Sequence, residues 1–439
     1  MIHAPHTTQY PAYKDSGVEW MGEIPDGWEV KKIKHVFENL NHRRIPLSAE
    51  VRADMIQKDY EYYGASGVID KVENYLFDEL LILVGEDGAN LLSRSSRLAF
   101  IAHGKYWVNN HAHILKPKSG DIRYFAELLE TIDYTTLVTG SAQPKLTQEN
   151  IVNITICVPP LSEQNAIARY LDEKTAQVDQ LIQQSEKIIA LLREQRAATI
   201  NHAVTKGLTH LPPEQGGTLG VPLYPSGVEW IGDVPEGWMV VKLGHYSTIV
   251  RGASPRPAGD SLLFDGDFTP WITVKAITNA TGKYVTNTDE MLTELGMKQS
   301  KLVYAETLVL SNSGATLGVP KILKIDGCIN DGSVAFISLS QKLFRDYLYY
   351  IFEALTLMLR EMQSGYGQPN LNTEIVSNLR VPLPHINTQE KIAQYLDEKT
   401  AEIDALARQE EGRIELLREY RAALISEVVT GKVRVPETA

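Results

Sequence analysis

The chain is 439 residues long, 43% hydrophobic and 22% charged, with a net charge of −12. Its length exceeds what one ordinary core organises and predicts two or three domains, while its composition excludes a disordered or low-complexity protein. The acidic balance disfavours a free-standing nucleic-acid binder, because neutralised phosphates supply most non-specific affinity. A DNA-binding role would require basic residues gathered on one face, or a partner that supplies further grip.

Membrane, secreted and metal-binding proteins find little support in the sequence. The longest apolar run, 80–84, is far too short to cross a bilayer, and the opening residues "MIHAPHTTQY" show no signal peptide. The two cysteines, Cys157 and Cys328, lie in unrelated contexts and indicate a reducing compartment, so we expect a cytoplasmic protein. No Cys/His group has zinc spacing, and no metal is expected.

The first predicted element is a Gly/Pro-rich motif, "SGVEWMGEIPDGW" at 16–28, which returns as "SGVEWIGDVPEGW" at 226–238. Nine of the thirteen positions are identical, and the other four exchange like for like. Glycine and proline set turns, and tryptophan supplies a large apolar anchor. We interpret this opening motif as a clamp that docks the start of each body, with base stacking by exposed tryptophans as the alternative. The tryptophans concerned are Trp20, Trp28, Trp230 and Trp238.

A body of about 150 residues follows each opening motif, and the two bodies differ in sequence. Runs such as "LLILVGEDGA" and "TLVLSNSGATLGVPKIL" are typical of short strands broken by Gly, Asn and Asp. Helical stretches are predicted over 122–131 and 343–362. Each body is therefore expected to be a mixed α/β globule.

Each body ends in a predicted long helix. The tract 162–207 returns as 387–432 at an offset of 225, and both copies contain "YLDEKTA". The same offset aligns "GSAQPKL" at 140–146 with "GYGQPNL" at 365–371. The chain is thus two tandem copies of one unit. Ser162 and Thr388 are the expected N-caps, directly after prolines that cannot continue a helix.

Apolar residues recur along both helices at heptad spacing, with Ser185 and Glu410 interrupting the stripe at equivalent layers. Neither helix can bury this stripe alone, so we expect an antiparallel pair about a pseudo-twofold axis. The alternative is that each helix packs only on its own body. The expected stripe contains Ile167, Leu171, Val178, Leu181, Ile188, Leu192, Ile392, Leu396, Ile403, Leu406, Leu417 and Leu424.

The predicted fold class is α+β, with two pseudo-symmetric mixed α/β domains joined by an antiparallel pair of long coiled-coil helices. A polar and flexible linker is expected before the second copy. The expected segments are domain 1 at 1–161, a central helix at 162–207, the linker at 208–222, domain 2 at 223–386, a C-terminal helix at 387–431 and a tail at 432–439.

This combination closely resembles the specificity subunit of type I restriction–modification systems over essentially the whole chain. The resemblance rests on the opening motif, on the "PLSEQ…IARYLDEKTA" helix start with its "TQEKIAQYLDEKTA" counterpart, and on the two "GxxQPxL" segments. Departures are slight: the second "EQ" becomes Thr388-Gln389, and Glu410 enters the helix stripe.

The resemblance implies a non-catalytic subunit with two target-recognition domains, each reading one half of a split site in double-stranded DNA, with the paired helices as a ruler. It also implies two modification subunits, which carry S-adenosylmethionine and methylate adenine, and restriction subunits, which use ATP and magnesium. No cofactor is expected in this chain. Affinity shared with these partners would account for the acidic balance.

Candidate DNA-reading residues are polar and basic side chains in the loops of both bodies, because base edges are read by Arg, Lys, Asn and Gln. Gln143 and Gln368 are shared by both copies, so we expect them to contact the DNA backbone and position it. Residues that differ between the copies are expected to give base specificity. The candidates are Asn90, Arg94, Arg97, Asn110, His111, Gln143 and Lys145 in the first body, and Arg251, Arg256, Lys275, Ser311, Asn312, Ser313, Asn330, Gln368 and Asn370 in the second.

Rival functions have weaker support. No Asn/Asp-Pro-Pro-aromatic loop of an adenine methyltransferase occurs, no Gly-rich cofactor loop follows a strand, and "VTGKV" lacks the rest of a Walker loop. His111 and His113 suggest a metal pair only weakly, since no carboxylate neighbours them in sequence. The remaining alternative is a coiled-coil structural adaptor without base-specific DNA reading.

Overall fold

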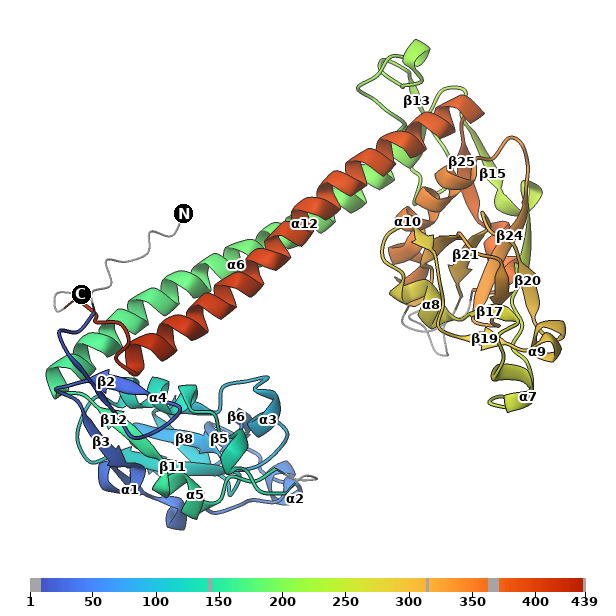
Figure 1. Cartoon of the computed structure of the whole chain (residues 1–439). Helices are drawn as coiled ribbons and strands as arrows, with labels where there is room; N and C mark the ends of the chain where they lie inside the picture. Colours follow the sequence, from blue (N-terminus) through green and yellow to red (C-terminus); the bar gives the residue numbers. More distant parts are fainter. Residues whose placement is uncertain (1–8, 141–143, 313–315, 362–370, 437–439) are drawn as a thin grey trace. The chain divides into compact units, whose positions relative to one another are not determined.

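The computed structural model describes residues 9–140, 144–312, 316–361 and 371–436. The chain forms two compact units, and the first combines Met1–Glu186 with Gly412–Ala439, while the second is Lys187–Glu411. Each unit therefore contains one body and part of both long helices (Figure 1).

The long helices are α6 (Leu161–Lys206) and α12 (Ile386–Val429). Both begin slightly earlier than the sequence predicts, so Ser162 and Thr388 lie in the first turn and are not N-caps. In α6 the ladder starts from Pro160, whose carbonyl accepts the Gln164 N–H at 3.0 Å. Proline lacks an N–H but keeps its carbonyl, so the residue before a helix can still accept the first bond.

Within each unit α6 and α12 lie side by side and antiparallel (Figure 1). In the first unit Asp179 pairs with Arg421 at 3.0 Å, and further along α6 Glu186 pairs with Arg418 at 3.8 Å. As one residue number rises the other falls, which defines the antiparallel direction.

The second unit contains the reciprocal pairs. Arg196 meets Asp404 at 3.1 Å, and Arg193 meets Glu411 at 3.4 Å. These four residues are the repeat equivalents of those in the first unit, at the offset of 225. The predicted antiparallel pairing is confirmed in both units.

The buried stripe departs from a strict heptad. Ile188 and Leu406 are 39% and 50% exposed, so their predicted place in the stripe is wrong. Ile189 and Ile414, both 7% exposed, are buried instead. Buried residues also lie eleven apart, from Val178 to Ile189 and Ile200 and from Ile403 to Ile414 and Ile425, while Leu417 and Leu424 are buried at their predicted heptad positions. Eleven residues make three turns of a straight helix, whereas strict heptads drift by about 20° each without supercoiling.

The first body (residues 29–158) contains two four-stranded sheets. The first sheet has the order β4-β11-β8-β9, and the second has the order β6-β5-β10-β7. Helix α4 (Ile122–Thr131), at its predicted bounds, packs against the first sheet with Phe125, Leu128 and Leu129 buried. The strands are β4 (Phe37–Asn39), β5 (Tyr60–Gly64), β6 (Gly67–Val72), β7 (Phe77–Asp78), β8 (Leu81–Gly85), β9 (Ala99–Ala102), β10 (Lys105–Val108) and β11 (Ala112–Pro117).

The second body (residues 239–383) repeats this topology. Its sheets have the orders β16-β24-β21-β22-β18 and β19-β17-β23-β20, with β18 as the one addition. Helix α10 (Arg345–Glu361) falls within its predicted stretch. The strands are β16 (Ser247–Arg251), β17 (Thr269–Ile272), β18 (Tyr284–Val285), β19 (Met291–Leu292), β20 (Lys301–Val303), β21 (Leu308–Ser311), β22 (Pro320–Leu323), β23 (Gly327–Ile329) and β24 (Ser333–Leu339).

Backbone hydrogen bonds match the two bodies residue by residue. Glu86 N–H donates to His111 O, and its carbonyl accepts from Leu146 N–H. In the second body Asn312 N–H donates to Gly332 O, and its carbonyl accepts from Leu371 N–H at 2.7 Å. The equivalence of Leu146 and Leu371 agrees with the sequence repeat. The bodies differ in sequence on one shared scaffold, as predicted.

The opening motif receives the end of a long helix. In the first unit Lys432 Nζ donates to Met21 O at 2.8 Å and to Glu23 O. In the second unit Lys206 Nζ makes the same two bonds, to Ile231 O at 3.3 Å and to Asp233 O. In both units a lysine at the end of a long helix thus satisfies two carbonyls of the motif and holds the motif against the helix end.

The tryptophans of the motif serve the core. Trp28 is 1% exposed, and Trp20, Trp230 and Trp238 pack as partly buried residues against the main core clusters. The clamp interpretation is confirmed over base stacking. The predicted flexible linker is instead folded back onto α6, since the Thr218 hydroxyl donates to Lys206 O at 2.7 Å and its side chain is buried.

The architecture is the predicted one, with two versions of a mixed α/β domain on an antiparallel pair of long helices. Among the residues that the structure describes, no helix combines the length and apolar character needed to span a bilayer.

Candidate nucleic-acid interface

In each body, polar residues converge on one hairpin tip. In the first body the tip is 109–111, between β10 and β11, and Asn109 N–H donates to Tyr63 O. In the second it is 330–332, between β23 and β24, where Asn330 N–H donates to Ile272 O. Each tip lies next to the end of the central strand, β8 or β21, which also binds Leu146 or Leu371, the last residue of the repeated "QPxL" segment.

The tip of the first body is organised around a buried carboxylate. Glu86, with a side chain 9% exposed, pairs with Arg44 and with Lys145 at 3.2 Å. Burial raises the pKa of Glu86, but the hydrogen bond from Arg44 and the neighbouring cations outweigh burial and hold it below its usual value. Arg44 also donates to Ala112 O at 2.8 Å and Asn110 O at 3.3 Å, so its guanidinium fastens the tip to the sheet.

The two histidines of this tip have opposite environments. His113 is fully buried; its Nδ1 lies 2.8 Å from Asn41 Nδ2, and its Nε2 lies 2.8 Å from Leu146 O. An amide donor on one side and a carbonyl acceptor on the other assign the Nε2–H tautomer. Burial lowers the pKa of His113, in the direction that favours this neutral tautomer. His111 is half exposed, and its Nδ1 lies 2.7 Å from Asp87.

The tip of the second body is organised around Asp331. The Asp331 carboxylate accepts from Ser254 Oγ at 2.6 Å and lies 3.7 Å from Arg256. The Asp331 carbonyl accepts from Arg251 Nε at 2.9 Å and from Asn312 Nδ2 at 3.3 Å. Four of the predicted residues, Arg251, Arg256, Asn312 and Asn330, therefore meet at this turn.

Other predicted residues have structural roles elsewhere. Arg94 donates to Glu130 O and Arg97 to Glu127 at 2.8 Å, so both face α4 and not the tip. Asn90 accepts from Ser96 N–H within its own loop. These contacts separate the three residues from Asn110, His111 and Lys145.

In the second body Ser311 is fully buried, and its hydroxyl donates to Thr316 O. Lys275 lies apart from the tip, beside a polar cavity formed by α8 (Val274–Asn279) and the segment 284–290. Gln143, Ser313, Gln368 and Asn370 lie outside the described residues.

Sequence reasoning missed an arginine, three acidic residues and a serine that build the tips. Arg44, Glu86, Asp87, Ser254 and Asp331 have no motif around them, and their partners are distant in sequence. The single available signal was the acidic "GED" directly after the apolar run 80–84.

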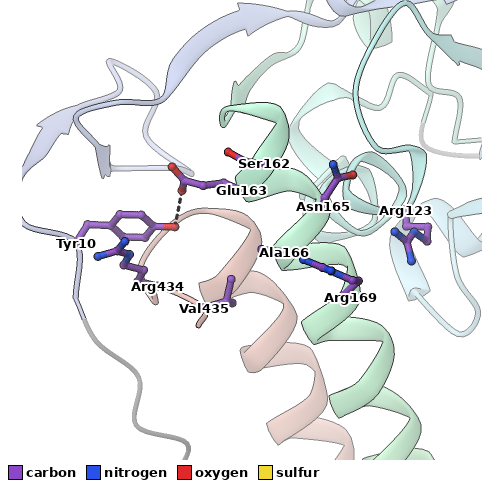
Figure 2. A pocket seen from close by; sticks show the side chains of 9 residues that line it. All are labelled: Tyr10, Arg123, Ser162, Glu163, Asn165, Ala166, Arg169, Arg434 and Val435. Atoms are coloured by element: carbon purple, nitrogen blue, oxygen red, sulfur yellow. Dashed lines mark hydrogen bonds between the residues drawn. The ribbon is translucent and has the colours of Figure 1, made fainter. Parts of the chain in front are cut away.

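Across the described residues no set of three or more His, Cys, Asp and Glu side chains is placed to hold a metal ion. Figure 2 shows a cavity of the first unit at the start of α6, where the Glu163 carboxylate accepts from Tyr10 Oη at 2.9 Å. Glu163 also accepts from Trp28 Nε1 at 2.9 Å, so this cavity belongs to the clamp and contains none of the predicted DNA-reading residues.

A duplicated body with one topology and two different hairpin tips defines a protein built from two versions of one binding domain. The family model for the type I restriction modification DNA specificity domain matches residues 25–191 and again 235–416. The chain belongs to this family of type I restriction–modification specificity subunits.

Individual relatives agree with this assignment. The chain is 31% identical to a putative type I restriction enzyme specificity subunit of Haemophilus influenzae over 160 residues, 36% of this chain and 40% of the relative. It is 23% identical to the MjaVIII specificity subunit of Methanocaldococcus jannaschii over 96% of this chain and 97% of the relative. A solved structure described as the type I R-M system matches with a TM-score of 0.61 and 18% identity, covering 92% and 98% of the chains, which supports the fold.

Proposed function

We propose that the chain is the non-catalytic, sequence-specific DNA-binding subunit of a type I restriction–modification complex. Each body acts as a target-recognition domain for one half of a bipartite site in double-stranded DNA, and the paired helices set the spacer between the halves. The alternative, a structural adaptor without base reading, gives no reason for polar and basic residues to gather at one equivalent tip in both bodies.

The observation that carries the proposal is the contrast between scaffold and tip. The strand order and the backbone bonds around 86 and 312 are the same in both bodies. The side chains there differ: Glu86 stands where Asn312 stands, Asn110 where Asp331 stands, and His111 where Gly332 stands. Base edges in the major groove are distinguished by their donors and acceptors, so different tips on one scaffold suit two different half-sites.

The acidic net charge fits a shared complex. We expect two modification subunits, which supply S-adenosylmethionine and adenine methylation, and restriction subunits that use ATP and magnesium. Phosphate contacts from these partners would add the affinity that a chain of charge −12 lacks.

A repeated exposed stripe on the helices supports a partner present in two copies. In the second unit Leu191, Glu194 and Ala198 are exposed and share one face of α6, since residues three, four and seven apart lie above one another. In the first unit their equivalents on α12, 416, 419 and 423, are identical and also exposed. Core packing does not explain this identity, because Leu191 and Leu416 are 54% and 68% exposed. We assign each stripe to one modification subunit.

The stripe gives a direct prediction for assembly. Leu191→Glu is expected to remove one of two bound modification subunits, and Leu191→Glu combined with Leu416→Glu to remove both, as counted by native mass spectrometry. Ile188→Glu is the matched control, since Ile188 is 39% exposed but has Arg413 at the equivalent position. Two modification subunits still bound to the double variant would refute the assignment.

Genomic methylation mapping tests the function as a whole. Cells that express this chain with its modification subunits are expected to carry one split adenine-methylated motif, modified on both strands. Methylation that is independent of this chain, or a motif without two separated halves, would contradict the proposal and favour the adaptor.

A further inference from the structure

The two hairpin tips hold an arginine on the same backbone carbonyl. Arg44 donates to Asn110 O at 3.3 Å in the first body, and Arg251 donates to Asp331 O at 2.9 Å in the second. Asn110 and Asp331 are equivalent, since each follows the asparagine whose N–H is bonded to the parallel neighbour strand. The arginines come from different positions, because Arg251 ends β16 while Arg44 follows β4 after a short turn.

What differs is the side chain at the end of the central strand. In the first body this is Glu86, and its carboxylate binds the Arg44 guanidinium. The side chains of Arg44 and Glu86 are only 14% and 9% exposed, so this arginine is neutralised and enclosed. A guanidinium that is enclosed and paired with a carboxylate cannot donate to a base.

In the second body the equivalent residue is Asn312, which is neutral and buried. Asn312 donates to the same Asp331 carbonyl, and its neutral amide does not pair with Arg251 as the Glu86 carboxylate pairs with Arg44. Within the part of the chain that the structure describes, Arg251 makes one hydrogen bond, through Nε, and its side chain is exposed. Both terminal amino groups of Arg251 are therefore open, while Nε fixes the direction of the guanidinium plane.

We propose that Arg251 reads a guanine in the half-site of the second body, whereas Arg44 reads no base in the first. The inference rests on the proposed DNA-reading function and adds the chemistry at one position. A guanidinium presents two parallel N–H donors that match guanine O6 and N7 in the major groove. The Arg251 plane is already oriented by the Asp331 carbonyl, which reduces the entropy lost when the base is bound.

The test uses the full chain in complex with its modification subunits. The recognised motif is first mapped by methylation, and the half that survives exchange of residues 30–160 is assigned to the second body. Each guanine of that half is then replaced by 7-deazaguanine, which lacks the N7 acceptor, and binding is measured by competition. One replacement is expected to weaken binding about tenfold, because it removes one of the two charge-assisted hydrogen bonds of the bidentate contact.

Arg251→Lys keeps the charge but removes the planar fork. It is expected to weaken binding to the unmodified site by a similar factor and to reduce the sensitivity to the 7-deazaguanine replacement, because a lysine does not present two parallel donors to O6 and N7. Arg256→Lys, at an exposed neighbour on the same turn, is the matched control and should keep the full sensitivity. Arg44→Lys should also keep the full sensitivity to the 7-deazaguanine replacement.

Undiminished 7-deazaguanine sensitivity in Arg251→Lys, or no sensitive guanine in that half, would overturn the inference while leaving specific DNA binding intact. Absence of any sequence-specific binding by the wild-type complex would instead overturn the proposed function itself. The two failures are therefore distinguishable.

Discussion

Lys283 shows how a body attaches to a repeated residue of the long helices. Its side chain is 10% exposed, and Nζ donates to Asp346 at 3.0 Å and to Asp397 at 2.7 Å. Asp397 belongs to the second "YLDEKTA", and its equivalent in the first copy, Asp172, accepts from Arg123 at 2.7 Å. The helix residue is the same in both units, but the cation comes from α4 in one and from the segment before β18 in the other.

Replacement of Lys283 by methionine is expected to destabilise the second unit by about 2–3 kcal/mol. The change leaves the enclosed Asp346 with Arg345 as its remaining cation, and unpairing a buried charge is costly. A shift of the urea unfolding midpoint measures the loss. Arg193→Met is the control, because Arg193 and Glu411 are 72% and 51% exposed and such a pair contributes about 0.5 kcal/mol or less. Equal losses from both variants would contradict this account.

At the scale of elements, the sequence predicted the long helices, because they depend on local pattern and on the repeat. The long helices begin within two residues of the predicted positions. Prolines end the segment before each helix, and the repeat shows the same helix pattern twice in the sequence. The buried stripe was predicted correctly at Leu417 and Leu424 but wrongly at Ile188 and Leu406, because some of the buried residues follow an eleven-residue spacing that a heptad pattern does not contain.

The candidate site was less predictable than the helices. Loop polarity singled out Asn110, His111, Lys145, Arg251 and Arg256, which the structure brings to the tips. It could not separate them from Arg94 and Arg97, whose carboxylate and carbonyl partners come from α4, about thirty positions away. Pairing between distant segments depends on sheet order, which no local pattern in either body reveals.

The contact between opening motif and helix end depends on one glycine. Gly431 has φ +74°, and a Cβ there would lie 2.4 Å from Pro25 Cδ and 3.0 Å from Trp28 Cη2. Gly431→Ala is expected to lower the free energy of unfolding of the first unit by about 2–4 kcal/mol, combining backbone strain with overlap. Gly17→Ala is the control, with φ +69° but open space around it, and should cost about 1 kcal/mol. Thermal unfolding compares the two, and the account fails if Gly17→Ala costs as much.

The proposed ruler role makes a second prediction for the helices. Insertion of one helical turn after "YLDEKTA" in both α6 and α12 lengthens each helix by about 5.4 Å. The methylated motif is then expected to carry a longer spacer with unchanged halves, or the complex should fail to assemble. Assembly with full methylation at the original spacer would exclude the helices as a ruler.

At the scale of the whole molecule, the two copies share their strand order and differ in the side chains of their hairpin tips. The same strand order carries the Glu86 tip in one body and the Asp331 tip in the other. Reading chemistry can therefore change in one body without disturbing the helices or the opening motifs.

Exchange of residues 30–160 for the corresponding body of another family member is accordingly expected to change one half of the methylated motif and to leave the other half and the spacer unaltered. Methylation mapping of the hybrid provides the measurement. The reverse exchange, of the second body, is the matched control and should alter the opposite half. A hybrid in which both halves change would show that the bodies do not read independently.

The membership of Gly412–Ala439 in the first unit has a consequence for biosynthesis. Ile425, Val428 and Val429, near the end of α12, are buried in the same core as Trp28 and Phe125. The first body must therefore wait until 412–429 has left the ribosome, whereas the second unit is complete at Glu411. A premature stop codon just before Gly412 would thus destabilise the first unit and leave the second unit with all of its residues.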